Sequence, residues 1–260
     1  MPSAETTSAL KHVSDTSLAG LLATAAGRML LDLRSSSSLT AARLRTEGDL
    51  RSHQLLLEQL GTHRAADHVL SEEGDDDGGR LTADRVWIVD PLDGTREYAE
   101  GRDDWAVHVA LWRSGELVAG AVALPALGFT ATSDDDLTLG PDGAEVLRLA
   151  VSRTRPPPIV ARLAELLPVE LVPMGSAGYK ALAVVRGEVD AYVHAGGQYE
   201  WDSAAPVAVA RAAGAVATRL DGSALRYNEP DPMLPDLVIA HPGRALALRS
   251  AIDIALGEGE

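Results

Sequence analysis

The chain has 260 residues, of which 46% are hydrophobic, contains no cysteine and carries a formal net charge of −15 at pH 7. This length suits one large domain or two packed halves, and the absence of cysteine excludes disulfides and thiol catalysis and fits a cytoplasmic protein. The acidic charge argues against nucleic-acid polymers and membranes as partners, and no apolar run approaches the roughly 20 residues of a membrane span. A small phosphorylated substrate remains compatible with this charge, because bound divalent metal inverts the local sign.

Two helices are predicted at the start of the chain. The first covers residues 14–34 and the second residues 47–60, ending at Gly61. Asp49 would then lie in the first turn of the second helix, where the helix dipole favours an acid. The apolar spacing predicts inner faces made by Leu18, Leu21, Leu22, Ala25, Met29 and Leu33 in the first helix, and by Leu50, Leu57 and Leu60 in the second.

A short strand at residues 68–73 ends in the pair Glu72-Glu73, which would ordinarily be a solvated surface feature. The next strand starts at Val86 and is rich in β-branched residues, as buried strands are. Pro91 lacks an N–H and is expected to end that strand, which leaves Asp90 at its carboxyl end and Asp93 across a tight turn. Gly94 allows close approach to a ligand and Thr95 opens a short helix, so two hard carboxylates stand beside a place suited to phosphate and Mg²⁺.

A run of antiparallel strands follows at residues 105–112, 117–124 and 129–131, and another strand at 146–151 begins the second half. Helices are predicted at 158–167 and up to 186, with strands at 169–174 and 189–194. Asp202 is expected to cap a helix over 203–213, before strands at 215–220 and 237–241 and a terminal helix. The pattern alone therefore predicts a mixed α/β fold with antiparallel and crossover strands.

Two polar segments of the second half are candidate substrate contacts. Arg153 lies in Ser152-Arg153-Thr154-Arg155, which suits a second phosphate as well as it suits a polar connector. Small residues between a strand and a helix can bind a phosphate or a sugar, and Lys180 follows them closely. This turn consists of Gly175, Ser176 and Ala177.

Two motifs carry a family resemblance. W-I-V-D-P-L-D-G-T at 87–95 and E-W-D-S-A-A-P at 200–206 resemble the two signatures of the inositol monophosphatase superfamily of metal-dependent, lithium-sensitive phosphatases. The second motif and G-R-D-D-W-A-V-H-V-A-L-W at 101–112 look most like actinobacterial CysQ-type 3'(2'),5'-bisphosphate nucleotidases. The resemblance implies a layered α-β-α-β-α sandwich with halves at residues 1–145 and 146–260 and the site in the crevice between them.

The resemblance also implies roles for individual residues. One Mg²⁺ would be held by Glu72, Asp90 and the Leu92 carbonyl, and a second by Asp90, Asp93 and Asp202. A third, weaker ion near Glu72 and replacement by Mn²⁺ stay open.

Three further residues would act on the attacking water, by the same resemblance. Asp49, in the family's T-x-x-D pattern at 46–49, would hydrogen-bond Thr95 and orient the water together with it, and Glu73 would help to position the water. Gly94, Thr95 and the 175–177 turn would contact substrate.

The substrate implied first is 3'-phosphoadenosine 5'-phosphate, hydrolysed to AMP in sulfate assimilation. Inositol 1-phosphate and fructose 1,6-bisphosphate are the alternatives, although the His194–Gly197 neighbourhood lacks the Glu with which inositol monophosphatases hold inositol hydroxyls. A phosphonucleotide-binding regulator without catalysis is a third hypothesis, which the complete set of carboxylates opposes. A homodimer is compatible with the resemblance.

Overall fold

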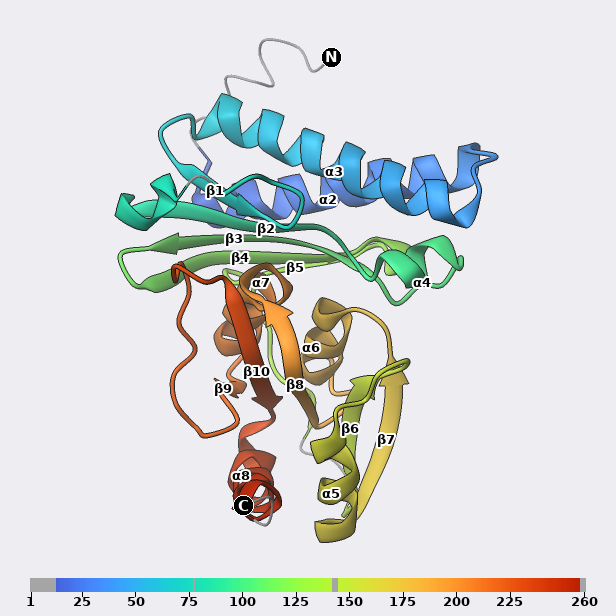
Figure 1. The fold of residues 1–260 in the computed structure, drawn as a ribbon, viewed down its shortest axis with the longest axis vertical. Coiled ribbons are helices and arrows are strands. Elements are labelled where there is room, and N and C mark those ends of the chain that lie inside the picture. Colours follow the sequence, from blue (N-terminus) through green and yellow to red (C-terminus); the bar gives the residue numbers. More distant parts are fainter. Residues whose placement is uncertain (1–12, 77, 142–144, 258–260) are drawn as a thin grey trace.

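The computed structural model describes residues 13–76, 78–141 and 145–257. Its elements stack in five layers, helices alternating with sheets (Figure 1). Helices α2 (Asp15–Ser36) and α3 (Ala41–His63) cover the outer face of the first sheet. Helices α6 (Ala177–Val185) and α7 (Glu200–Ala212) lie between the two sheets, and α5 (Pro158–Leu166) and α8 (Pro242–Gly257) form the last layer. This is the α-β-α-β-α sandwich expected from the resemblance.

The first sheet has the order β1-β2-β3-β4-β5, with β1 parallel to β2 and the other pairs antiparallel. The second sheet has the order β7-β6-β8-β10-β9, parallel across β7, β6 and β8 and antiparallel beyond. The strands of the first are β1 (His68–Ser71), β2 (Arg85–Asp93), β3 (Ala106–Arg113), β4 (Glu116–Leu124) and β5 (Phe129–Thr132). Those of the second are β6 (Leu147–Ser152), β7 (Val169–Met174), β8 (Ala191–Tyr199), β9 (Val216–Thr218) and β10 (Met233–Ala240).

Three apolar clusters hold the layers together. One joins α2 and α3 to the first sheet through side chains such as Leu18 and Trp87. The central cluster surrounds α6 and α7 and contains Ile88 from one sheet and Ile239 from the other. The third packs α5 and α8 on the second sheet. In the described part of the chain, none of the helices combines the length and apolar character that crossing a bilayer requires.

Several sequence-based expectations about the helices were wrong. Helix α3 begins at Ala41, capped by Thr40, so Asp49 lies in mid-helix rather than in the first turn. Leu21, Leu50 and Leu57 are 49%, 46% and 37% exposed, and Ala25 is exposed too. Short residues take their places in the interface: Ala19, Ala23 and Ala26 in α2, and Gly48 and Ser52 in α3.

Two expectations about element ends were also wrong. Strand β2 does not stop at Pro91 but continues to Asp93, because an irregularity in its pairing with β3 between Asp90 and Asp93 accommodates the proline. Helix α7 begins at Glu200, so Asp202 is its third residue and not its N-cap. The N-cap residue is Tyr199, and the Asp202 carboxylate accepts a hydrogen bond from the Tyr199 backbone N–H.

Candidate active site

Asp90 lies where β2 departs from regular pairing. It is 1% exposed, and its Oδ1 accepts a hydrogen bond from the Leu92 backbone N–H at 3.0 Å. From α3, Ser52 Oγ donates to the Pro91 carbonyl at 2.7 Å. These bonds fix the turn that carries both aspartates of the D-P-L-D-G-T motif.

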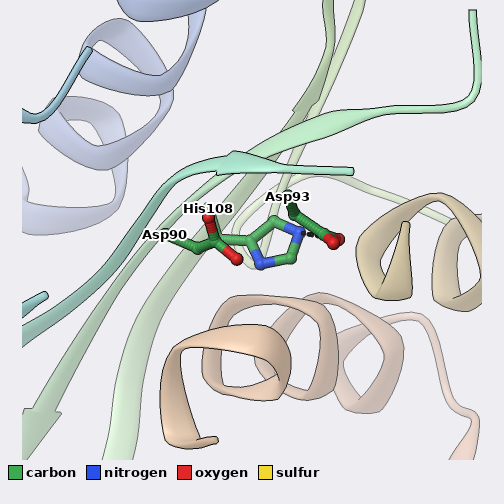
Figure 2. A group of neighbouring side chains, drawn as sticks. All are labelled: Asp90, Asp93 and His108. Carbon is green, nitrogen blue, oxygen red and sulfur yellow. Dashed lines mark ion pairs between the residues drawn. The ribbon is translucent and has the colours of Figure 1, made fainter. Parts of the chain in front are cut away.

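Asp93 has a different environment from Asp90. Its Oδ2 accepts hydrogen bonds from Ser176 Oγ at 2.5 Å and from the Gly178 backbone N–H at 2.8 Å, both at the start of α6. The imidazole of His108 lies beside it on β3, with Nε2 3.2 Å from the same oxygen (Figure 2). Burial raises the pKa of Asp93, but His108 and Ser176 outweigh it and hold that pKa below its usual value.

Glu72, Asp90, Asp93 and Asp202 come together from three regions of the chain. Burial and the charge of Asp202, followed by other acids, raise the pKa of Glu72 to about 8. Burial and the charge of Glu72 raise the pKa of Asp90 well above its usual value, and burial and Asp93 raise the pKa of Asp202 to about 6. Apart from Asp93, the acids of this cluster are therefore not neutralised by the protein around them.

A divalent metal ion fits this cluster. The ligand atoms that Asp90, Asp93 and His108 offer lie within 4.8 Å of one another (Figure 2). Carboxylate oxygens are the hard donors that Mg²⁺ and Mn²⁺ prefer, and a cation would remove the mutual repulsion that raises these pKa values.

Asp49 reaches the site because α3 packs closely on the motif. A Cβ atom on Gly48 would lie 2.9 Å from Leu92 Cδ2, so only glycine permits this approach without a shift. Burial, and then the charge of Glu73, raise the pKa of Asp49 to about 7. Among the described residues, the hydrogen bonds do not include one between Asp49 and Thr95, which the resemblance had implied.

A cavity of about 320 Å³ opens beside the cluster, between the start of α4 (Thr95–Ala99), the start of α6 and β8. All of the predicted substrate contacts and two of the predicted metal ligands line this cavity. They are Asp93, Gly94, Thr95, Arg153, Gly175, Ser176, Ala177, Lys180 and Asp202.

The 175–177 turn is held rigidly in place. Ser176 adopts a φ of 48°, which is unusual for a residue other than glycine, and its Oγ bridges Asp93 and the Tyr179 backbone N–H. Lys180 is buried, and its Nζ donates to the carbonyls of Gly175 and Ser176 at 3.2 and 2.5 Å. Lys180 therefore holds the turn in place through these two hydrogen bonds.

Arg153 already has protein partners. Its guanidinium forms ion pairs with Glu97 at 2.7 Å and Glu100 at 2.8 Å. Arg45 and Arg155, which the sequence reasoning did not select, line the same cavity, and Arg45 Nε is buried without a hydrogen-bond partner. These two arginines thus add positive charge at the cavity wall.

The wall formed by β8 is polar but neutral. Gln198 is 6% exposed and donates to the Tyr192 hydroxyl at 2.7 Å, while its Oε1 has no hydrogen-bond partner. His194 Nε2 is also buried without a partner, and burial lowers the pKa of His194 to about 4. Sequence reasoning missed Gln198 and His194, although both alternate with Tyr192 along one strand and could have been grouped by that period.

Residues 14–253 match the model of the Inositol monophosphatase family. The chain is 50% identical to a "3'-phosphoadenosine 5'-phosphate phosphatase" of Mycobacterium leprae, over 93% of this chain and 94% of that protein. It is 30% identical to the "3'(2'),5'-bisphosphate nucleotidase CysQ" of Escherichia coli K12, over 73% and 81%. The crystal structure of CysQ from Bacteroides thetaiotaomicron matches with a TM-score of 0.76 at 26% identity, covering 88% of this chain and 98% of that one.

Proposed function

Because the chain belongs to the inositol monophosphatase family, we propose that it is a metal-dependent phosphatase that removes the 3'-phosphate of 3'-phosphoadenosine 5'-phosphate, giving AMP and inorganic phosphate. The assignment of this substrate rests on the 50% identity to a protein of that named activity, over nearly the full length of both chains. The reaction would clear a by-product of sulfate assimilation in the cytoplasm. A second candidate substrate is 3'-phosphoadenosine 5'-phosphosulfate, which carries the same 3'-phosphate.

The carboxylate cluster would hold Mg²⁺, or Mn²⁺ in its place. Glu72, Asp90 and the Leu92 carbonyl would hold one ion, and Asp90, Asp93 and Asp202 a second, with a third, weaker ion near Glu72. Bound ions of this kind neutralise the charge of the phosphate and lower the pKa of a bound water molecule, so that the water can lose a proton and attack phosphorus.

Other residues of the site would orient the attacking water and accept its proton. Thr95, at the start of α4, would orient the attacking water, and Asp49 would accept its proton, with Glu73 beside it. Lithium sensitivity is part of this proposal.

The substrate would lie across the cavity between the halves at 1–145 and 146–260. Gly94 and the turn at Gly175, Ser176 and Ala177 would contact the phosphate that is cleaved, with Lys180 compensating charge behind the turn. The segment around Arg153 would take the second phosphate. The neutral wall of β8 suits a nucleoside, because it offers hydrogen bonds without a charge.

Phosphate release with Mg²⁺ from 3'-phosphoadenosine 5'-phosphate, inositol 1-phosphate and fructose 1,6-bisphosphate, each with and without lithium, tests the proposal. We expect the nucleotide to have the highest kcat/KM and its hydrolysis to be inhibited by lithium. A preference for either sugar phosphate would keep the metal chemistry and overturn the substrate. A protein that binds metal and nucleotide but releases no phosphate would instead be a binding regulator.

A further inference from the structure

His108 is a buried polar residue in the middle of β3, with no exposed surface. Its imidazole contacts two elements that lie across from the first sheet, the starts of α6 and α7. Nδ1 lies 3.0 Å from the Trp201 carbonyl oxygen in the first turn of α7, and Nε2 lies 3.2 Å from Asp93 Oδ2. One ring therefore joins Asp93 of β2 to the turn that carries Asp202.

The His108 ring fits against α6 because residue 178 is a glycine. A Cβ atom on Gly178 would lie 2.0 Å from His108 Nε2. The Gly178 backbone N–H donates to the same Asp93 oxygen that the ring approaches, as does Ser176 Oγ. Three protein groups thus converge on Asp93 Oδ2 and leave Oδ1 for another partner.

We propose that His108 is a positioning residue of the metal site. Its contact keeps Asp93 Oδ2 bound to protein groups, so that Oδ1 faces the metal. Its contact with the Trp201 carbonyl fixes the first turn of α7 relative to β2. This inference rests on the proposed function to the extent that Asp93 and Asp202 hold metal. It states that His108 is not itself a metal ligand, although its nitrogen lies within 4.8 Å of ligand atoms of Asp90 and Asp93 (Figure 2).

The hydrogen-bond geometry supports a positioning role over direct ligation. A carbonyl oxygen can only accept, so His108 Nδ1 must carry a proton and has no lone pair for a metal. Within the described part of the chain Nε2 makes no hydrogen bond, but it lies 3.2 Å from a carboxylate oxygen of Asp93 that already accepts two hydrogen bonds. Side chains that orient metal-binding carboxylates in this way typically affect metal affinity by about 10–100-fold when they are replaced.

Mn²⁺ binding to the full-length protein, measured by electron paramagnetic resonance without substrate, tests the proposal. We expect His108→Leu, which fills the space without hydrogen bonds, to weaken Mn²⁺ binding about tenfold or more. His108→Gln can place its amide nitrogen near Nε2 and should restore much of the affinity, whereas His108→Asn reaches only toward Trp201 and should not. His68→Leu, at the exposed start of β1 in the same sheet, is the matched control and should bind Mn²⁺ as the wild type does.

A second readout needs no variant. Pulsed electron paramagnetic resonance of Mn²⁺ in the wild-type protein should detect no directly coordinated nitrogen, because every proposed ligand is an oxygen. A directly bound ¹⁴N would make His108 a ligand and overturn the proposal, and so would unchanged Mn²⁺ affinity in a folded His108→Leu protein. If that variant does not fold, the wild-type spectrum and the Gln and Asn variants decide. Normal Mn²⁺ behaviour without nucleotide hydrolysis would refute the proposed function and leave this inference standing.

Discussion

Asp90 and Asp93 are three residues apart, and the protein treats them in opposite ways. Asp93 receives hydrogen bonds from Ser176 and Gly178 and an ion pair from His108, and its pKa is lowered. Asp90 is equally buried but faces other acids, and its pKa is raised. The protein itself compensates the charge of Asp93, whereas the charge of Asp90 awaits a cation.

Replacing Asp90 by Asn should therefore have opposite effects on turnover and on the stability of the metal-free protein. We expect kcat to fall at least about a hundredfold, because a metal ligand is lost. The melting temperature in EDTA should rise, because one of four clustered acids becomes neutral. Asp136→Asn, in an exposed loop, should change neither quantity. Near-wild-type turnover in Asp90→Asn would contradict the assignment of Asp90 as a metal ligand.

The raised pKa values also predict how pH acts on the metal-free protein. Because the pKa values of Glu72 and Asp49 are raised to about 8 and 7, the folded state binds more protons than the unfolded chain in this range. Stability in EDTA should then fall, by about 1 kcal/mol, as pH rises from about 6.5 to about 8, since solvent screening reduces the contribution of the exposed Glu72. The lowered pKa values of His53 and His194 oppose this mainly below about pH 7, because the histidines of the unfolded chain are half protonated at 6.5 and lose the remaining protons above it.

Thermal unfolding at several pH values, in EDTA and in Mg²⁺, measures this effect. Mg²⁺ should remove most of the slope, because a bound cation favours the ionised carboxylates. Glu72→Gln should also reduce the slope in EDTA. A stability that stays constant or rises between pH 6.5 and 8 in EDTA would contradict the prediction.

Sequence reasoning selected residues that belong to a recognisable motif and did not select those that act through packing. Asp90, Asp93 and Asp202 belong to signatures with characteristic spacing. His108 stands in an apolar strand, where a histidine ordinarily indicates a satisfied core residue. Only the tertiary structure shows that its two nitrogens meet Asp93 and the Trp201 carbonyl.

At the scale of elements, apolar periodicity predicted the helices better than it predicted their faces. The layers press α2 and α3 tightly onto their neighbours, so small residues such as Ala23 and Gly48 occupy the contacts while Leu21 and Leu50 remain exposed. A hydrophobic ranking favours leucine at such positions and cannot recognise close approach. The strands were easier, because residues buried on both faces form continuous apolar runs.

Close packing of α7 on β4 connects an element contact to the site. A Cβ atom on Gly120 would lie 2.5 Å from Ala208 Cβ and 3.2 Å from the Ala205 carbonyl oxygen. Gly120→Ala should push α7 away from the first sheet, with a cost of about 1–3 kcal/mol in unfolding free energy. Since α7 carries Asp202, Mn²⁺ binding should weaken as well.

Chemical denaturation and Mn²⁺ titration measure both effects of Gly120→Ala. Gly61→Ala is the matched control, because it lies inside α3 with no atom within 4 Å of its added Cβ. That control should gain about 0.5–1 kcal/mol from helix propensity and keep its metal affinity. Weakened stability with unchanged Mn²⁺ affinity in Gly120→Ala would separate α7 packing from the metal site.

At the scale of the whole molecule, the candidate site depends on residues from both sheets and the helices between them. Glu72 and Asp90 come from the first sheet and its connections, whereas Asp202 and the 175–177 turn come from helices of the central layer. The central apolar cluster includes residues of both sheets, such as Ile88 and Ile239. Relative movement of the layers would therefore alter the cluster of acids directly.

A buried polar link also joins the two parts of the chain. Arg80, 2% exposed in the turn at Gly79–Thr82, donates to Asn228 Oδ1 at 2.8 Å, and Asn228 Nδ2 donates to the Arg80 carbonyl at 3.1 Å. Asn228 in turn donates its backbone N–H to Glu200 at the start of α7. This chain of bonds connects the loop after Glu72 to the helix of Asp202.

Arg80→Met should break this link while keeping most of the side-chain volume. We expect a loss of about 2–4 kcal/mol in unfolding free energy, because the buried Asn228 Oδ1 loses its donor and Asp76 loses its ion pair. Arg51→Met, which removes an exposed ion pair with Glu47 in α3, should cost at most about 0.5 kcal/mol. Urea denaturation compares the two variants, and equal small losses would show that the link between Arg80 and Asn228 contributes little. If the link instead fixes α7 relative to the loop after Glu72, Arg80→Met should also weaken Mn²⁺ binding, since Glu72 and Asp202 would no longer be fixed relative to each other.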